Sequence, residues 1–221
     1  MRPVSPVRTI AGIFTLAVAA ASAAGAQHRP IIALRADALM MWVHSDTGVT
    51  HTSLRGPAFG GEGRVSVNDL VFGLGLLEGQ LKPVGGVGGA PQRDVVQGTV
   101  FVGGRPVPWL EMTAGPVVRA YVTDSTTERW VFWQARARVD ASIVVGKLAS
   151  YLEVWRAFSS DVNLPTGAGR IQGGEAGVVF QPPQRPVWLR LSYRMDDALL
   201  GGPGGNETME AITLSGGIVI P

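Results

Sequence analysis

Strict alternation of apolar and polar side chains is the feature that most constrains how this chain can fold. In residues 129–144 one set of alternate positions is apolar from Val131 onward, whereas the other set carries Arg136, Arg138 and Asp140 in succession. Side chains of a β-strand point alternately to opposite faces, so this pattern predicts a strand with one apolar and one charged face. The alternation recurs along much of the chain, and helical periodicity is scarce. The fold is therefore predicted to be all-β.

Short turns rich in Gly and Pro join these segments in pairs, which predicts antiparallel hairpins. Longer polar links separate one pair from the next, and an opening strand and a closing strand complete the set. The eight predicted strands are residues 31–43, 95–102, 108–122, 129–144, 148–159, 170–181, 187–196 and 207–220.

Residues 44–94 do not fit this count, because they are too long for an ordinary loop. Within them, residues 65–81 alternate like a strand but also carry a helical stripe of apolar positions, which Gly73 and Gly75 weaken. We expect 44–94 to be a long loop or an extra strand region. If it spans as strand, another strand is needed to keep the number even. Eight strands are predicted, and ten are the alternative.

Residues 1–26 have the pattern of a cleaved signal peptide. Arg2 and Arg8 precede a charge-free apolar run, and Ala24-Gly25-Ala26 forms a small-residue cleavage site. An uncleaved anchor is the alternative, but the run is shorter than the ~20 residues of a membrane helix. We therefore expect an exported protein whose single domain is 27–221.

Composition excludes several classes of function. The absence of cysteine rules out a disulfide framework, a thiolate zinc site and a cysteine nucleophile. The chain has 19 basic and 17 acidic residues, and this formal charge of +2 is too small to indicate nucleic-acid binding. Arg2 and Arg8 account for the whole excess, so the exported domain is balanced in charge.

Alternation alone also fits a soluble β-sandwich or a soluble barrel, in which the apolar face packs inward. Three features favour a transmembrane β-barrel, in which the apolar face contacts lipid. The apolar face is rich in Ala, Leu, Val and Ile. Arg dominates the polar face, and Lys82 and Lys147 are the only lysines of the chain. The strands also reach the ~9–11 residues of a tilted membrane strand. We predict an antiparallel up-and-down transmembrane β-barrel.

This layout resembles the small bacterial outer-membrane β-barrel proteins of the eight-stranded type. The resemblance implies a location in the bacterial cell outer membrane. We expect a monomer that contacts outer-membrane lipid and lipopolysaccharide and is inserted by the outer-membrane assembly machinery. Such proteins usually end in an aromatic residue, whereas this chain ends in Ile220-Pro221, and its aromatic girdle is thin. The aromatic residues predicted to face lipid are Trp42, Trp133, Phe180 and Tyr193, whereas Trp109, Trp130 and Trp188 fall on the charged face.

The polar positions assign charges of both signs in equal number to the barrel interior. An eight-stranded barrel is filled by its own side chains, and an unpaired buried charge is very costly. We therefore expect ion pairs that plug the barrel, with a narrow pore as the alternative that ten strands would favour. The predicted interior network is Arg35, Asp37, Glu111, Arg119, Arg136, Arg138, Asp140, Glu153, Glu175, Arg190, Arg194 and Asp196.

Catalytic and metal sites find little support in the sequence. His44, Ser45, Asp46 and His51 could supply a base, a nucleophile and an orienting group, but we expect them to lie in a solvated loop. Two histidines seven residues apart are not a specific metal signal, and no cofactor is predicted. The predicted function is a non-enzymatic outer-membrane barrel with a structural or surface-interaction role. The alternatives are a narrow outer-membrane pore, a small lipid-modifying outer-membrane enzyme and a soluble periplasmic β-barrel that binds an apolar ligand.

Overall fold

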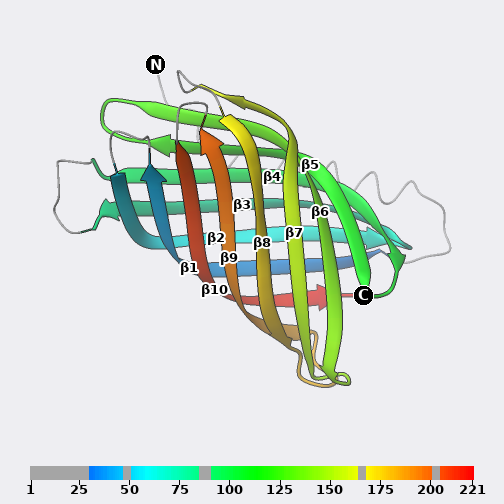
Figure 1. Ribbon diagram of the computed structural model, residues 1–221. Helices are drawn as coiled ribbons and strands as arrows, with labels where there is room; N and C mark the ends of the chain where they lie inside the picture. The colour runs from blue at the N-terminus through cyan, green and yellow to red at the C-terminus, as the bar shows by residue number, and fades with distance from the viewer. Residues whose placement is uncertain (1–29, 47–50, 85–90, 164–167, 201–204) are drawn as a thin grey trace, which may run out of the picture.

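Ten antiparallel β-strands close into one barrel in the computed structural model of the chain (Figure 1). Each strand pairs with its neighbours in sequence, and the last strand pairs with the first to complete the wall. The structure describes residues 30–46, 51–84, 91–163, 168–200 and 205–221. The strands are β1 (Ile31–Asp46), β2 (His51–Val67), β3 (Leu70–Pro83), β4 (Arg93–Val107), β5 (Leu110–Val122), β6 (Thr127–Val144), β7 (Leu148–Val162), β8 (Ala168–Phe180), β9 (Val187–Leu200) and β10 (Asn206–Ile220).

The predicted all-β, antiparallel up-and-down barrel is confirmed, but the predicted number of eight strands is wrong and the alternative of ten is observed. The difference lies within 44–94, where β2 and β3 form a hairpin around Asn68 and Asp69. Pro57 and four glycines of β2 obscure its alternation, so the sequence does not show it as a strand. The predicted signal peptide, residues 1–26, lies outside the described residues.

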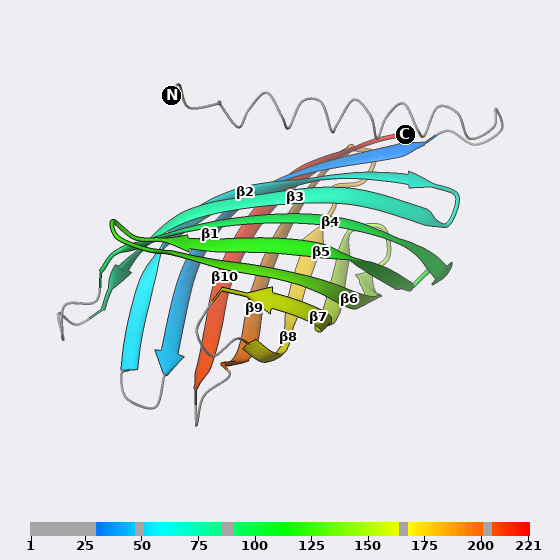
Figure 2. The same cartoon turned by 90° about the horizontal axis from the view of Figure 1, so that it is seen from above.

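The two ends of the barrel differ in their connections. The turn end carries the turns 68–69, 108–109, 145–147 and 181–186, together with the start of β1 and the end of β10. The opposite end, called the link end, carries the other segments between strands. Figures 1 and 2 show strands of one side crossing those of the other steeply, as tilted strands of a closed barrel do. No helix in the described part of the chain is long and apolar enough to cross a membrane.

The outer face of the wall is apolar on all ten strands. Large apolar side chains are exposed there, including Phe59 at 65%, Leu189 at 56% and Leu214 at 59%. Among the described strands, outward charges lie in the half of the wall nearer the link end. They are Asp46, Arg55, Glu78, Lys82, Asp94, Arg129, Arg156, Asp161, Arg170, Asp197 and Glu210.

Glycines on the inner face make room for aromatic rings from the neighbouring strand. Each of these glycines is paired in register with an aromatic residue, and a Cβ added to the glycine would overlap the ring. The bare backbone therefore lets the ring lie close to the wall while it fills the lumen. The pairs are Gly73 with Phe101, Gly173 with Trp155, Gly177 with Tyr151 and Gly217 with Trp188.

Candidate functional site: the barrel lumen

The inner face of the described strands carries basic and acidic side chains in equal number. Twelve of them are the residues assigned to the interior from the sequence, and six more come from positions that sequence reasoning missed. Equal numbers let the lumen be neutral overall. The inward charges are the arginines 35, 64, 93, 105, 119, 136, 138, 190 and 194 and the carboxylates Asp37, Glu62, Glu111, Glu128, Asp140, Glu153, Glu175, Asp196 and Glu207.

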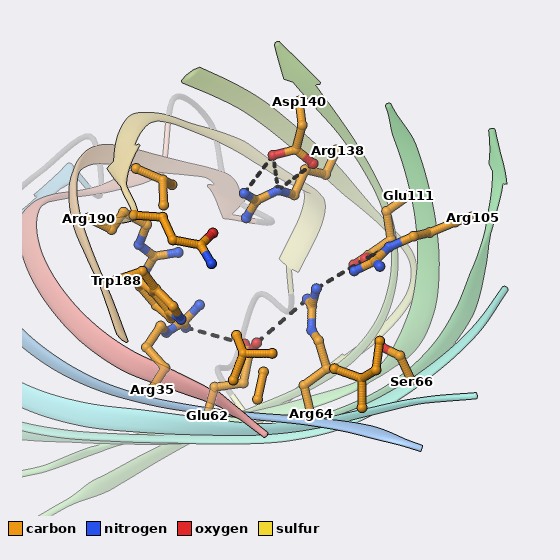
Figure 3. A pocket seen from close by; sticks show the side chains of 15 residues that line it. Arg35, Glu62, Arg64, Ser66, Arg105, Glu111, Arg138, Asp140, Trp188 and Arg190 are labelled. Carbon is orange, nitrogen blue, oxygen red and sulfur yellow. Dashed lines mark hydrogen bonds and ion pairs between the residues drawn. The ribbon is translucent and has the colours of Figure 1, made fainter. Parts of the chain in front are cut away.

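An unbroken chain of ion pairs crosses the lumen near the turn end. Figure 3 shows its centre, where Glu62 lies between Arg35 and Arg64. The signs alternate along the chain, so each inner member has a counter-charge on both sides, which buried charges require. The successive pairs are Arg105–Glu111 (3.0 Å), Glu111–Arg64 (3.0 Å), Arg64–Glu62 (3.6 Å), Glu62–Arg35 (3.2 Å), Arg35–Asp37 (2.9 Å), Asp37–Arg190 (3.4 Å) and Arg190–Glu175 (3.5 Å).

A second ionic group is more deeply buried. The Nη2 atoms of Arg119 and Arg194 donate to Asp196 Oδ2 at 2.6 and 3.0 Å. Arg119 Nε also donates to the amide oxygen of Gln97 at 2.8 Å. The side chains of Arg119 and Asp196 are only 4% and 5% exposed, so their charges depend on one another and not on solvent.

Aromatic rings fill the space between the remaining charges. The Arg138 guanidinium lies 3.9 Å from the centre of the Tyr151 ring, and that of Arg194 lies 4.6 Å from the centre of the Trp155 ring. Such stacking favours arginine over lysine at these positions. Two further ion pairs join predicted interior residues: Arg136–Glu153 at 3.3 Å and Arg138–Asp140 at 2.8 Å. With these, each of the twelve predicted interior charges is in an ion pair.

Free volume in the lumen falls with distance from the turn end. A vestibule of roughly 440 Å³ opens there, lined by the chain of ion pairs and by Trp188. The two gaps further in, around Arg136, measure only about 70 and 40 Å³. Gaps of this size hold only a few water molecules, because each needs at least about 10–15 Å³.

Apolar side chains fill the lumen toward the link end. Trp130 and Tyr121 are each 1% exposed and meet edge to face, with ring centres 6.4 Å apart. The parity of the strands places this group on the inner face, at the same level as the buried ionic group, because Arg119 is the register partner of Trp130 and Asp196 that of Met209. The apolar cluster comprises Met41, Val43, Leu54, Ala58, Leu81, Val95, Val117, Tyr121, Trp130, Phe132, Ile171, Ala198, Met209 and Ala211.

Some of the inward charges and the apolar cluster were not predicted, although the sequence contains patterns that point to them. Glu62 and Arg64 lie on β2, whose glycines obscure the alternation. Arg93 and Glu128 occupy inward positions near the link end, where they pair at 3.5 Å. The apolar cluster was also signalled, because Trp130 falls on the charged parity of β6.

The histidines of the predicted loop lie on strands at the link end. His44 Nδ1 is 3.1 Å from Ser53 Oγ, and His51 Nδ1 is 3.0 Å from Asp46 Oδ2. Adjacent strand residues point to opposite faces, so Ser45 does not share a face with His44. The described residues hold no group of three or more His, Asp or Glu that could bind a metal ion.

The four aromatic residues predicted to face lipid lie on the outer face. Trp133, Phe180 and Tyr193 are 46–49% exposed, and Trp42 is half-buried. Tyr193 donates to Glu210 at 2.7 Å, which ties an outward carboxylate to an aromatic side chain. Phe59, Phe72 and Phe158 are further exposed aromatics on outward positions, and Trp109 lies exposed in a turn.

Solved structures with a similar layout include, by their descriptions, a translocator domain, a surface protein and a FadL homologue. The translocator domain of autotransporter NalP from Neisseria meningitidis is 12% identical, covers 94% of this chain and 95% of its own, and has a TM-score of 0.45. Neisserial surface protein A is 16% identical, with coverages of 85% and 96% and a TM-score of 0.36. A FadL homologue from Pseudomonas aeruginosa is 8% identical, with coverages of 86% and 90% and a TM-score of 0.38. No family model and no curated protein matches the chain.

Proposed function

We propose that this chain is a monomeric integral barrel of the bacterial outer membrane, non-enzymatic, with a structural or surface-interaction role and a lumen that conducts no ions. One observation carries the proposal: polarity is inverted, with apolar side chains exposed on all ten strands and, inside, 17 of the 18 described inward charges in ion pairs, Glu207 being the exception. The proposed orientation places the turn end, with its short turns and the strand ends Ile31 and Ile220, toward the periplasm.

The exposed apolar belt supports a lipid environment. Soluble monomers rarely expose contiguous apolar patches larger than a few hundred Å². A belt that runs from Phe59 and Leu214, on the two strands that flank β1, to Leu152 on β7 across the barrel is much larger, and lipid is the solvent that tolerates it. A soluble barrel that binds an apolar ligand needs the reverse arrangement, with an apolar cavity inside and a polar outside.

Two groups of side chains support a sealed lumen. The apolar cluster around Trp130 fills the link end, and the chain of ion pairs crosses the lumen near the turn end. An ion that passed through would have to displace both. The lipid-modifying alternative loses support because His44 contacts Ser53, and Ser45 points to the other face.

Heat modifiability and fractionation test the membrane assignment. Unboiled, folded protein should migrate differently from boiled protein on detergent gels, because a closed barrel resists detergent until it is heated. In cells, the protein should remain with the membranes until detergent is added. Release into osmotic-shock fluid without detergent would contradict the proposal.

Planar-bilayer recording tests the sealed lumen separately. The purified barrel should insert without producing steps of current, and a known porin in the same bilayer serves as the positive control. Sustained open current from the wild-type barrel would favour the narrow pore instead.

A further inference from the structure

Two cations face each other on the outer surface of the barrel near the link end. Arg55 on β2 and Lys82 on β3 are register partners, and both side chains are exposed. Side chains directly opposite each other on adjacent strands have their Cβ atoms about 4.5–5.5 Å apart, and like charges in such a pair are destabilising. This arrangement contrasts with the lumen, where charges of opposite sign are neighbours.

Neither cation is in an ion pair within the described residues. All 17 acidic residues of the chain lie in the described ranges, so no further carboxylate of this chain remains to neutralise them. Among outward carboxylates nearby, Asp94 accepts from Gln80 at 3.3 Å, and Glu210 accepts from Tyr193 at 2.7 Å. Glu78 lies two outward positions below Lys82, about 13 Å along the strand. Among the described residues, no carboxylate of the chain is in an ion pair with either cation, although Asp94 lies diagonal to Lys82 on the same outer face.

The surroundings of the pair are amphipathic. Trp42 on β1 is the register partner of Arg55 on its other side. Toward the turn end, the same outer surface continues through Pro57 to Phe59, which is 65% exposed, and Met40 on β1 is 43% exposed. An occupant that fits has an anionic group at the level of the two cations and an apolar chain along the surface below.

We propose that Arg55 and Lys82 bind the phosphate group of a lipid in the leaflet around the link end, with its acyl chain along Phe59 and Met40. A guanidinium donates two parallel hydrogen bonds to phosphate oxygens, and an ammonium adds a point charge to a third oxygen. A lipid phosphomonoester, which carries a charge of about −1.5 to −2 at pH 7, neutralises most of the charge of both cations and so reduces their repulsion, whereas the single charge of a phosphodiester neutralises only one of them. The inference rests on the proposed function, because only a membrane-embedded barrel presents this surface to lipid.

Binding can be measured on the full-length folded barrel in non-ionic detergent. Phosphatidic acid is titrated against phosphatidylcholine of the same acyl chains, and the fraction of protein carrying lipid is counted by native mass spectrometry. The wild type should prefer phosphatidic acid, and the R55Q/K82Q variant should bind it at least about tenfold more weakly, since two charge-assisted contacts are lost. Lys147→Gln, an exposed cation in the turn between β6 and β7, is the matched control and should bind as the wild type does.

Thermal stability gives a second test, because the effect of Arg55→Gln on the temperature of heat modification should differ in direction between two kinds of vesicle. In vesicles of phosphatidylcholine, Arg55→Gln should leave the temperature of heat modification unchanged or raise it, because it removes a like-charge pair. In vesicles containing phosphatidic acid, the same variant should unfold at a lower temperature than the wild type. Inorganic phosphate added to phosphatidylcholine vesicles should not reproduce the effect, because it lacks the apolar chain.

Three results would overturn the inference. They are equal retention of phosphatidic acid by the wild type and R55Q/K82Q, loss of retention in Lys147→Gln, and an equal effect of inorganic phosphate. Each is distinguishable from failure of the proposed function, because the barrel would still be heat-modifiable and membrane-bound.

Discussion

The two halves of the lumen are filled by different chemistry inside one continuous wall. Toward the link end the filling is mostly apolar and tight, with Trp130 and Tyr121 almost fully buried beside the Arg119–Asp196 pair. Toward the turn end it is ionic and opens into a vestibule of roughly 440 Å³. Apolar side chains need only shape to exclude water, whereas charges need partners at set distances and leave gaps around them. We propose that the mostly apolar half seals the barrel, whereas opposite charges near the turn end neutralise one another.

Trp130→Ala should have the largest effect, because it removes the centre of the apolar seal. Truncation of a buried Trp costs about 3–5 kcal/mol of unfolding free energy, which urea titration in vesicles measures. The variant should also give ion currents in planar bilayers, where the wild type gives none. Trp133→Ala, an outward position of the same strand, is the control and should remain non-conducting. If the Trp130→Ala barrel gave no ion current, the ionic half would also seal the lumen.

Asp196→Asn should break the buried ionic group, which lies at the level of the apolar cluster, without removing any apolar side chain. The amide keeps the shape of the side chain, but Arg119 and Arg194 lose their common counter-charge. We expect a loss of about 3 kcal/mol in the free energy of unfolding, as for a broken buried ion pair, and no ion current. Asp124→Asn, exposed between β5 and β6, is the control for loss of a charge. Current through Asp196→Asn would show that this ion pair, and not the apolar side chains alone, blocks the lumen.

Gly73→Ala tests whether close packing against the wall is needed to fill the lumen. The added Cβ would overlap the Phe101 ring, so the ring must move, at a cost of about 1–3 kcal/mol measured by the same urea titration. Gly75→Ala is the matched control two residues along β3, because its Cβ would be 3.5 Å from the nearest atom, an ordinary contact. Equal stability of the two variants would mean that Phe101 is free to reorient.

Asp140→Asn should have the smallest effect. The Asp140 side chain is 42% exposed at the turn end, and Arg138 retains its contact with the Tyr151 ring. Exposed ion pairs contribute about 0–1 kcal/mol and are screened by salt. The difference from the wild type should therefore shrink further as salt is raised. A loss as large as that of Asp196→Asn would show that the vestibule excludes solvent.

The alternation of the sequence predicts the barrel well where the lumen is ionic. In β6 the contrast between Arg136, Arg138 and the apolar residues between them reveals which face is inward, and the structure places these arginines in the lumen. The contrast disappears where the inner face is apolar too. In β3 leucines occupy both faces, with Leu74 and Leu76 outward and Leu77 and Leu81 inward. The segment therefore also fits the apolar stripe of a helix.

β2 was missed for a different reason. Its outward positions include glycines, so its outer face carries few of the large apolar side chains that mark a lipid-facing strand. The sequence also does not predict which charged residues pair with one another across the lumen. Glu111 pairs with Arg64 and Arg105 and not with any predicted interior residue, because the pairing depends on how ten strands close, and the ring size was unknown.

The pairing of β1 with β10 determines when the barrel can close during folding. It joins the two most distant strands of the chain, in register from Ile32–Ile220 to Asp46–Asn206. Contacts so far apart in sequence form slowly, because most of the chain must be ordered before they are made. Until β10 arrives, every intermediate keeps two strand edges whose backbone groups can pair with another chain. A chain shortened at its C-terminus is thus not a smaller barrel but an open sheet, and we expect proteases or aggregation to remove it.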